Sequence, residues 1–151
     1  VLALARDESA QAAWRASPAL DRTAPDELLR ACSPVQLTGR TITETMEVAG
    51  TELEAGTFCM VLLGGANRDP AVFDDPTSVR LDRDPNPHLG FGFGLHHCLG
   101  APLARLEARV ALRRLLDRTS SFALADAGVV RYRPNLVLRG LEHLDVTAAA
   151  A

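Results

Sequence analysis

Apolar residues recur at helical spacing within the first 17 residues. They predict a helix that ends before Ser17-Pro18, because a residue that precedes proline avoids the α region. No capping residue precedes its apolar start, so we expect this helix to be a segment of a longer chain. Its apolar positions include Leu2, Ala5, Ala12 and Trp14.

A second helix is predicted to begin near Thr23. Thr23 and Asp26 have the spacing of a capping box, and Pro25 suits a first helical turn, where a backbone N–H has no partner. We expect the helix to end at Ser33-Pro34, again because the residue before proline avoids the α region.

The pattern changes to that of short strands between residues 35 and 63. Residues Thr38–Thr45 alternate loosely, and glycines at positions 50 and 56 mark turns. The continuous apolar run Thr57–Leu63 predicts a buried strand. Residues 67–86 are rich in proline and aspartate and show little periodicity, so we expect an ordered loop there.

The clearest helical pattern covers Pro102–Arg118, with most of its arginines facing outward. Residues Phe122–Val146 predict short strand-like pieces, and we expect the alanine tail, residues 148–151, to fray. These patterns predict one α+β domain over residues 1–151, with helices at the start and after the loop and small antiparallel β-sheets between them. The apolar side of the 102–118 helix is expected to carry Leu103, Leu106, Val110 and Leu116.

The amino-acid composition argues against several classes of protein, including nucleic-acid-binding and membrane-spanning proteins. A chain of 151 residues with 47% hydrophobic and 23% charged residues is typical of one globular domain. The net charge of −3 argues against a nucleic-acid partner, and no apolar run approaches the roughly 20 residues that span a membrane. Cys32, Cys59 and Cys98 show no C-x-x-C spacing, which argues against structural zinc or a disulfide scaffold and favours a reducing, cytoplasmic location.

The candidate chemistry lies in Phe91–Gly100, which reads F-G-F-G-L-H-H-C-L-G. Its glycines suit positive φ angles or a close approach of the backbone to a bulky group. Cys98 lies just ahead of the helix predicted from Pro102, where free N–H groups and the positive end of the helix dipole favour a thiolate. A thiolate held against a flat group is the arrangement needed to ligate haem iron. Taken alone, Cys98 would be interpreted as an ordinary buried thiol.

The spacing Phe91-x-x-Gly94-x-x-x-Cys98-x-Gly100 resembles the haem-ligand signature of the cytochrome P450 superfamily. The following G-A-P-L-A-R-L-E-A-R-V-A-L-R is similar to the soluble bacterial branch of that family. The resemblance implies that Cys98 is the axial thiolate ligand of haem b and that Phe91 packs beside it. It also implies that Gly92, Gly94 and Gly100 let the loop approach the haem ring.

The resemblance also assigns partners to the two haem propionates. Arg40, in T-G-R-T-I-T-E, occupies the position of a propionate-binding arginine of the family, and arginine can engage a carboxylate bidentately. His96 matches a family histidine with the same role, and His88 is a further candidate for that edge of the haem. His97 has no assigned role.

Glu27 and Arg30 stand at i, i+3 and share one helix face. By themselves they indicate a solvated ion pair of small energetic value. The segment E-L-L-R-A-C-S-P-V-Q, however, is similar to the family's helix with a buried Glu/Arg pair, which implies that they brace the haem loop. The family usually adds an arginine where this chain has Ser78, so either Arg80 substitutes for it or the brace is weaker.

The resemblance implies a haem-thiolate monooxygenase that uses dioxygen and electrons from a ferredoxin- or flavodoxin-type partner to oxidise a small apolar substrate. The expected fold is the C-terminal part of the cytochrome P450 fold without the distal oxygen-activating helix. An alternative is a non-catalytic, truncated remnant that binds haem weakly or not at all. Zinc held by His96, His97 and Cys98 is a further alternative, although adjacent residues rarely point at one ion.

Overall fold

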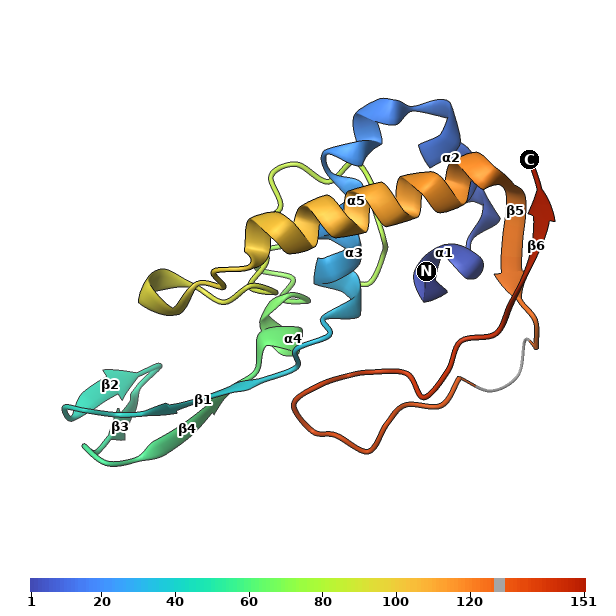
Figure 1. The fold of residues 1–151 in the computed structure, drawn as a ribbon. Coiled ribbons are helices and arrows are strands. Elements are labelled where there is room, and N and C mark those ends of the chain that lie inside the picture. The colour runs from blue at the N-terminus through green and yellow to red at the C-terminus, as the bar shows by residue number, and fades with distance from the viewer. Residues whose placement is uncertain (127–129) are drawn as a thin grey trace.

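A long helix, α5 (Ala101–Arg118), crosses the molecule in the computed structural model, which describes residues 1–126 and 130–151 (Figure 1). The shorter helices α2 (Glu8–Ala16) and α3 (Ala24–Cys32) pack along it. The strand pair β5 (Thr119–Leu124) and β6 (Val146–Ala150) lies at its C-terminal end, whereas the remaining strands extend beyond its N-terminal end (Figure 1).

The first 17 residues form two helices rather than the single helix predicted from their apolar spacing. Helix α1 (Leu2–Ala5) ends at Arg6, and α2 begins after Asp7. The Asp7 carboxylate accepts a hydrogen bond of 2.9 Å from the backbone N–H of Ala10, so Asp7 acts as an N-cap and starts a new helix. A short 3-10 helix, η1 (Pro18–Asp21), follows.

Helix α3 ends where Pro34 predicted, because Ser33 takes a left-handed conformation with φ of 39°. Its start differs from the predicted capping box. The Thr23 hydroxyl makes no capping bond and instead donates to the backbone carbonyl of Leu81 at 2.6 Å. Thr23 therefore anchors a distant loop against α3.

The strands form two-stranded antiparallel sheets: β1 (Thr38–Thr41) pairs with β4 (Phe58–Val61), β2 (Met46–Val48) with β3 (Thr51–Leu53), and β5 with β6. Two predictions about the strands were wrong. The apolar run 57–63 is largely exposed, with Phe58 at 67% of its surface accessible, and its end begins helix α4 (Leu63–Ala66). The alanine tail does not fray, because Ala148 pairs with Phe122. Residues 127–129, within the region predicted to hold strand-like pieces, lie outside the described residues.

Buried apolar side chains join α1, α2, α3 and α5 to β5. Gln11 is also fully buried, and its amide bonds the carbonyls of Leu4 and Phe122 at 2.7 Å each. On α5 the buried leucines are Leu112 and Leu116. The other predicted apolar positions, Leu103, Leu106 and Val110, are exposed, because the core meets only the C-terminal half of the helix. The core residues are Leu4, Ala5, Trp14, Ala24, Leu28, Leu81, Leu112, Leu116 and Phe122.

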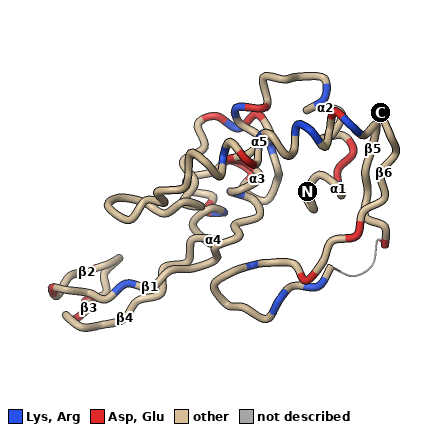
Figure 2. Tube along the Cα trace, viewed as in Figure 1, with Lys and Arg blue, Asp and Glu red and all other residues tan. Residues whose placement is uncertain are grey.

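Positive and negative side chains are interspersed along the helices and along the loops that connect them (Figure 2). In contrast, the segment from 85 to 104, which leads into α5, carries no Lys, Arg, Asp or Glu. Within residues 1–126 and 130–151, no helix combines the length and the apolar character needed to cross a membrane.

Candidate functional site

Two glycines with positive φ shape the loop that carries Cys98. Gly92 has a φ of 74° and Gly94 a φ of 69°, a region that side chains other than glycine rarely enter. The chain then makes a short 3-10 helix, η2 (Gly94–His96), and returns on itself. The backbone N–H of Cys98 donates to the carbonyl of Phe91 at 2.8 Å, and this bond closes the loop just ahead of α5.

Cys98 lines a cavity of about 350 Å³ between α3, α5 and the loop. The wall is predominantly apolar, and Asp26 and Arg105 are its charged members. The segment from Pro34 to Gln36 borders it and is held by residues 137–139, since Gln36 N–H donates to Val137 and Arg139 N–H to Pro34, both at 2.8 Å. The apolar wall consists of Pro25, Leu29, Pro34, Val35, Gly90, Phe91, Ala104 and Ala108.

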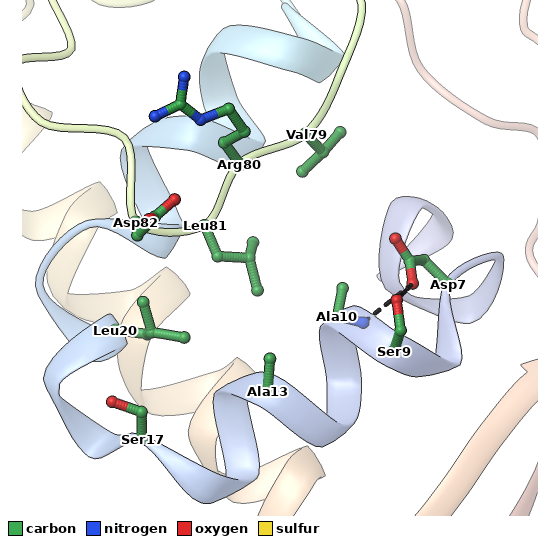
Figure 3. Close-up of a pocket in the computed structure, with 10 residues that line it drawn as sticks. All are labelled: Asp7, Ser9, Ala10, Ala13, Ser17, Leu20, Val79, Arg80, Leu81 and Asp82. Atoms are coloured by element: carbon green, nitrogen blue, oxygen red, sulfur yellow. Dashed lines mark hydrogen bonds between the residues drawn. The ribbon is translucent and has the colours of Figure 1, made fainter.

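A larger hollow of about 460 Å³ lies elsewhere, between α2 and residues 79–82 (Figure 3). Two acidic residues, Asp7 and Asp82, line it, and Asp7 already accepts hydrogen bonds from Ser9 and Ala10 in the cap of α2 (Figure 3). No histidine or cysteine lines it. We therefore place the candidate site at Cys98 rather than in the larger hollow.

Glu27 is the centre of a buried cluster that holds residues 80–86, which precede the Cys98 loop, against α3. Its carboxylate accepts from Arg30 at 2.8 and 2.9 Å and from Arg83 at 3.0 Å. Asn86 and the backbone N–H of Arg80 also donate to it, at 3.1 and 2.8 Å. Burial by itself raises the pKa of Glu27, but the hydrogen bonds from Arg30 and Arg80 and the positive charge of Arg30 outweigh it, so the pKa lies below its usual value.

Arg83 was missed by the sequence analysis, which considered only Arg80 or a weaker brace. The side chain of Arg83 reaches Glu27 and also donates to the carbonyl of Asp74 at 2.9 Å. Arg80 contributes through its backbone alone, because its side chain is exposed. The available signal was a second arginine three residues further along the same loop, but sequence spacing cannot reveal which of the two turns inward.

Asn67 is a second buried polar residue that the sequence analysis missed. Its amide nitrogen donates to the Ser33 hydroxyl at 2.9 Å, and its carbonyl oxygen accepts from the N–H of Leu89 at 2.6 Å. Arg30 in turn donates to the backbone carbonyl of Asn67 at 2.8 Å. Asn67 thus connects the end of α3 to the start of the Cys98 loop.

His88 is turned toward Asp26, rather than presented at the edge of the cavity as a carboxylate partner. Its Nε2 lies 3.0 Å from Asp26 Oδ1, and its side chain is 3% exposed. Arg105 donates to the same carboxylate at 2.8 Å. Burial favours a higher pKa for Asp26, but hydrogen bonds from His88 and Arg105 and the charge of Arg105 hold it below the usual value.

The two residues predicted to bind the haem propionates, Arg40 and His96, are exposed. Arg40 lies on β1 and donates to the Thr38 hydroxyl at 3.0 Å and to the Gly39 carbonyl at 2.7 Å. His96 lies in η2, and His97 follows with its ring 6.3 Å from that of Phe91. Within the part of the chain that the structure describes, no three His, Cys, Asp or Glu side chains gather as a metal-binding group.

The sequence model of cytochrome P450 matches residues 20–127, which is more than half of the chain. The chain belongs to the cytochrome P450 family. It is 47% identical over 133 residues to the biotin biosynthesis cytochrome P450 of Bacillus subtilis, a match that covers 88% of this chain and 33% of that protein. It is 43% identical over 132 residues to the polyketide biosynthesis cytochrome P450 PksS of the same organism, covering 86% and 33%. The chain thus spans about a third of the length of these relatives.

Solved cytochrome P450 structures share the fold. The crystal structure of P450BioI in complex with an acyl carrier protein ligated to hexadec-9Z-enoic acid superposes with a TM-score of 0.93 at 44% identity, over 97% of this chain and 38% of that one. The Bacillus subtilis PksS structure gives 0.93 at 40% identity, over 98% and 39%. The predicted α+β fold, part of the cytochrome P450 fold, is confirmed.

The family implies haem, and the residues around Cys98 fit such a group. Haem is flat and largely apolar, and the concave wall beside Cys98 is apolar and borders an uncharged loop. The Cys98 residue itself is exposed, so its sulfur is accessible to an iron ion. Arg40 and His96 are exposed, and their cationic or hydrogen-bonding side chains have the chemistry that haem carboxylates require.

Proposed function

We propose that this chain forms the haem-ligating part of a haem-thiolate monooxygenase, with Cys98 as the axial ligand. The observation that carries the proposal is the position of Cys98, which lies in the wall of an apolar cavity at the end of a glycine-shaped loop. Bound haem would supply the activation of dioxygen, and a thiolate ligand favours O–O cleavage by donating electron density to the iron.

The chain's own residues have separate tasks in this proposal. Phe91 packs beside the ligand and accepts the backbone hydrogen bond of Cys98, while Gly92, Gly94 and Gly100 keep the loop free of side chains that would obstruct the haem. Arg40 and His96 bind the propionates. The buried cluster of Glu27, Arg30 and Arg83 holds the loop in place and takes no part in the chemistry.

The substrate and the redox partner are proposed for a protein as long as the relatives, of which this chain spans about a third. We infer a small apolar substrate oxidised with electrons from a ferredoxin- or flavodoxin-type protein. The relatives' names include a steroid C26-monooxygenase of Mycolicibacterium smegmatis, 46% identical over 121 residues, and a 6-deoxyerythronolide B hydroxylase of Saccharopolyspora erythraea, 41% identical over 133 residues. The first name gives a steroid as the molecule acted on, and a steroid is largely apolar, which supports the apolar class.

The ligand assignment can be tested by reconstituting the chain with haem and recording its reduced, carbon monoxide-bound spectrum. We expect a thiolate-type band that Cys98→Ala abolishes. Cys59→Ala is the matched control, because Cys59 lies on β4 away from the cavity lining, and it should keep the band. A thiolate-type band that survives in the Cys98→Ala protein would overturn the assignment.

A second candidate is a non-catalytic chain that binds haem weakly. The observation behind it is that Leu95 and Leu99, on either side of Cys98, are 102% and 99% exposed. Haem affinity depends on buried apolar area, and such an open surround buries little. Oxidation of an apolar substrate by the purified 151-residue chain, supplied with dioxygen and a reducing partner, would eliminate this candidate.

A further inference from the structure

Asp26 joins two segments that flank the Cys98 loop. Its carboxylate accepts from Arg105 Nε at 2.8 Å to Oδ1 and 3.1 Å to Oδ2, so it holds the first turns of α5 against α3. The same Oδ1 lies 3.0 Å from Nε2 of His88, which precedes the loop. The partly buried carboxylate of Asp26 thus contacts both α5, through Arg105, and the segment before the Cys98 loop, through His88.

The hydrogen bonds of His88 define its tautomer. The backbone N–H of Gly90 donates to His88 Nδ1 at 3.1 Å, so Nδ1 is an acceptor and carries no proton. The remaining nitrogen, Nε2, then carries the proton and donates it to Asp26. His88 is therefore an oriented link between Asp26 and the loop.

Phe91 lies between these two partners of Asp26. The guanidinium of Arg105 stands 4.6 Å from the centre of the Phe91 ring, and the His88 ring centre lies 6.0 Å from it. The Phe91 carbonyl accepts the N–H of Cys98. Arg105 and His88 therefore contact the ring of the residue whose backbone carbonyl holds Cys98.

We propose that Asp26, acting through His88 and Arg105, is a positioning residue that clamps Phe91 and thereby sets the orientation of Cys98. This inference rests on the proposed role of Cys98 as a haem ligand. The Asp26 contacts are separate from the Glu27 cluster, because the two residues are adjacent on α3 and their side chains therefore face different segments. Glu27 holds residues 80–86, whereas Asp26 holds α5 and the entry to the loop.

The test is amide hydrogen exchange of the haem-free chain, read at Cys98 and at its neighbours in the loop. Asp26→Asn places an N–H₂ group against Arg105 and removes the charge that orients it. We expect Cys98 to exchange about tenfold faster in this variant, because opening the loop no longer breaks a charge-assisted contact. Arg105→Lys keeps the positive charge but loses the planar group over Phe91, so it should accelerate exchange in the same place.

Asp117→Asn is the matched control. Asp117 pairs with Arg113 at 2.9 Å on α5 and contacts no residue of the loop, so exchange at Cys98 should be unchanged. Faster exchange confined to the loop in both Asp26→Asn and Arg105→Lys supports the clamp. Equal acceleration throughout α2 and β5 would show general destabilisation and overturn it, as would a change at Cys98 of less than about twofold.

A haem-loaded measurement separates this inference from the proposed function. In the reconstituted chain, Asp26→Asn should lower the share of the thiolate-type carbon monoxide band relative to the parent and the Asp117→Asn control. If the parent shows no thiolate band, the proposal that Cys98 ligates haem fails. The exchange data on the haem-free chain then still test whether Asp26 positions Cys98. If the parent shows the band and neither its share nor the exchange rate responds to Asp26→Asn, the clamp alone is wrong.

Discussion

Replacing Arg83 with methionine tests which arginine completes the cluster around Glu27. Methionine retains much of the length of the side chain but cannot donate a hydrogen bond. Arg80→Met is the matched control, since both arginines lie on the same loop and only Arg83 sends its side chain to Glu27. The structure predicts a large loss of stability for Arg83→Met and almost none for Arg80→Met.

The magnitude follows from the contacts that each side chain makes. The side chains of Arg83 and Glu27 are 6% and 0% exposed, so solvent screens their 3.0 Å contact very little. A hydrogen bond to a charged group contributes about 1.5–3 kcal/mol to the free energy of unfolding. Glu27 keeps Arg30 as a counterion, so the loss stays below the roughly 3–5 kcal/mol of an unpaired buried charge. Arg80 donates through its backbone N–H, which methionine preserves, and we expect a change within about 0.5 kcal/mol.

Urea unfolding of the 151-residue chain measures these differences. With a slope of about 2 kcal/mol per molar urea, the Arg83→Met midpoint should fall by about 1 M. A double-mutant cycle with Glu27→Gln should show coupling to Arg83 and none to the Arg80 side chain. Equal midpoints for the two methionine variants, or a larger loss for Arg80→Met, would refute the assignment of Arg83 as the third member.

Two further predictions concern the same support. The pKa of Glu27 in the folded chain lies below its ordinary value of 4.5, so the unfolded chain binds the proton more tightly. The ionised Glu27 therefore stabilises the fold above pH 4.5, and this stabilisation is lost as the pH falls from 4.5 through the folded-state pKa. Urea midpoints of Glu27→Gln should therefore depend less on acid than those of the parent, and parallel declines would contradict this reasoning. A Cβ on Gly90 would lie 2.9 Å from Leu29 Cγ, so Gly90→Ala should cost about 1–3 kcal/mol in the free energy of unfolding. Gly140→Ala, with no atom within 4 Å of the added carbon, should unfold like the parent, and equal losses would argue against tight packing at Gly90.

Features that depend on short stretches of chain could be predicted from sequence. Helix α3 ends at Cys32 just ahead of Ser33-Pro34, and α5 begins beside Pro102, because proline restricts φ and lacks an N–H. Gly92 and Gly94 take positive φ angles where the glycine-rich loop required them. The spacing from Phe91 to Gly100 also indicated the family, which the comparisons confirmed. The roles of Cys98 and its cofactor contacts stay predictions.

Other features depended on which segments meet in space. Apolar periodicity marked Leu106, Val110 and Leu116 as one side of α5. Only the folded chain shows that Leu116 and the unmarked Leu112 are buried, whereas Leu106 and Val110 are exposed. The alanine tail has no side-chain signal for a strand, yet its backbone pairs with β5. A strand needs a partner for its N–H and C=O groups, and that partner can come from anywhere in the chain.

The positive-φ glycines of the Cys98 loop, the helix ends beside Pro34 and Pro102 and the family can be predicted from short stretches of sequence. The reason for the backbone features is that the preferences of glycine and proline act over a few residues. The folded chain is needed to show that Arg83 rather than Arg80 reaches Glu27 and that His88 turns to Asp26. These choices depend on the path of the loop between α4 and α5. Residues three apart on such a path can point in opposite directions, and burial rather than spacing selects the one that must be paired.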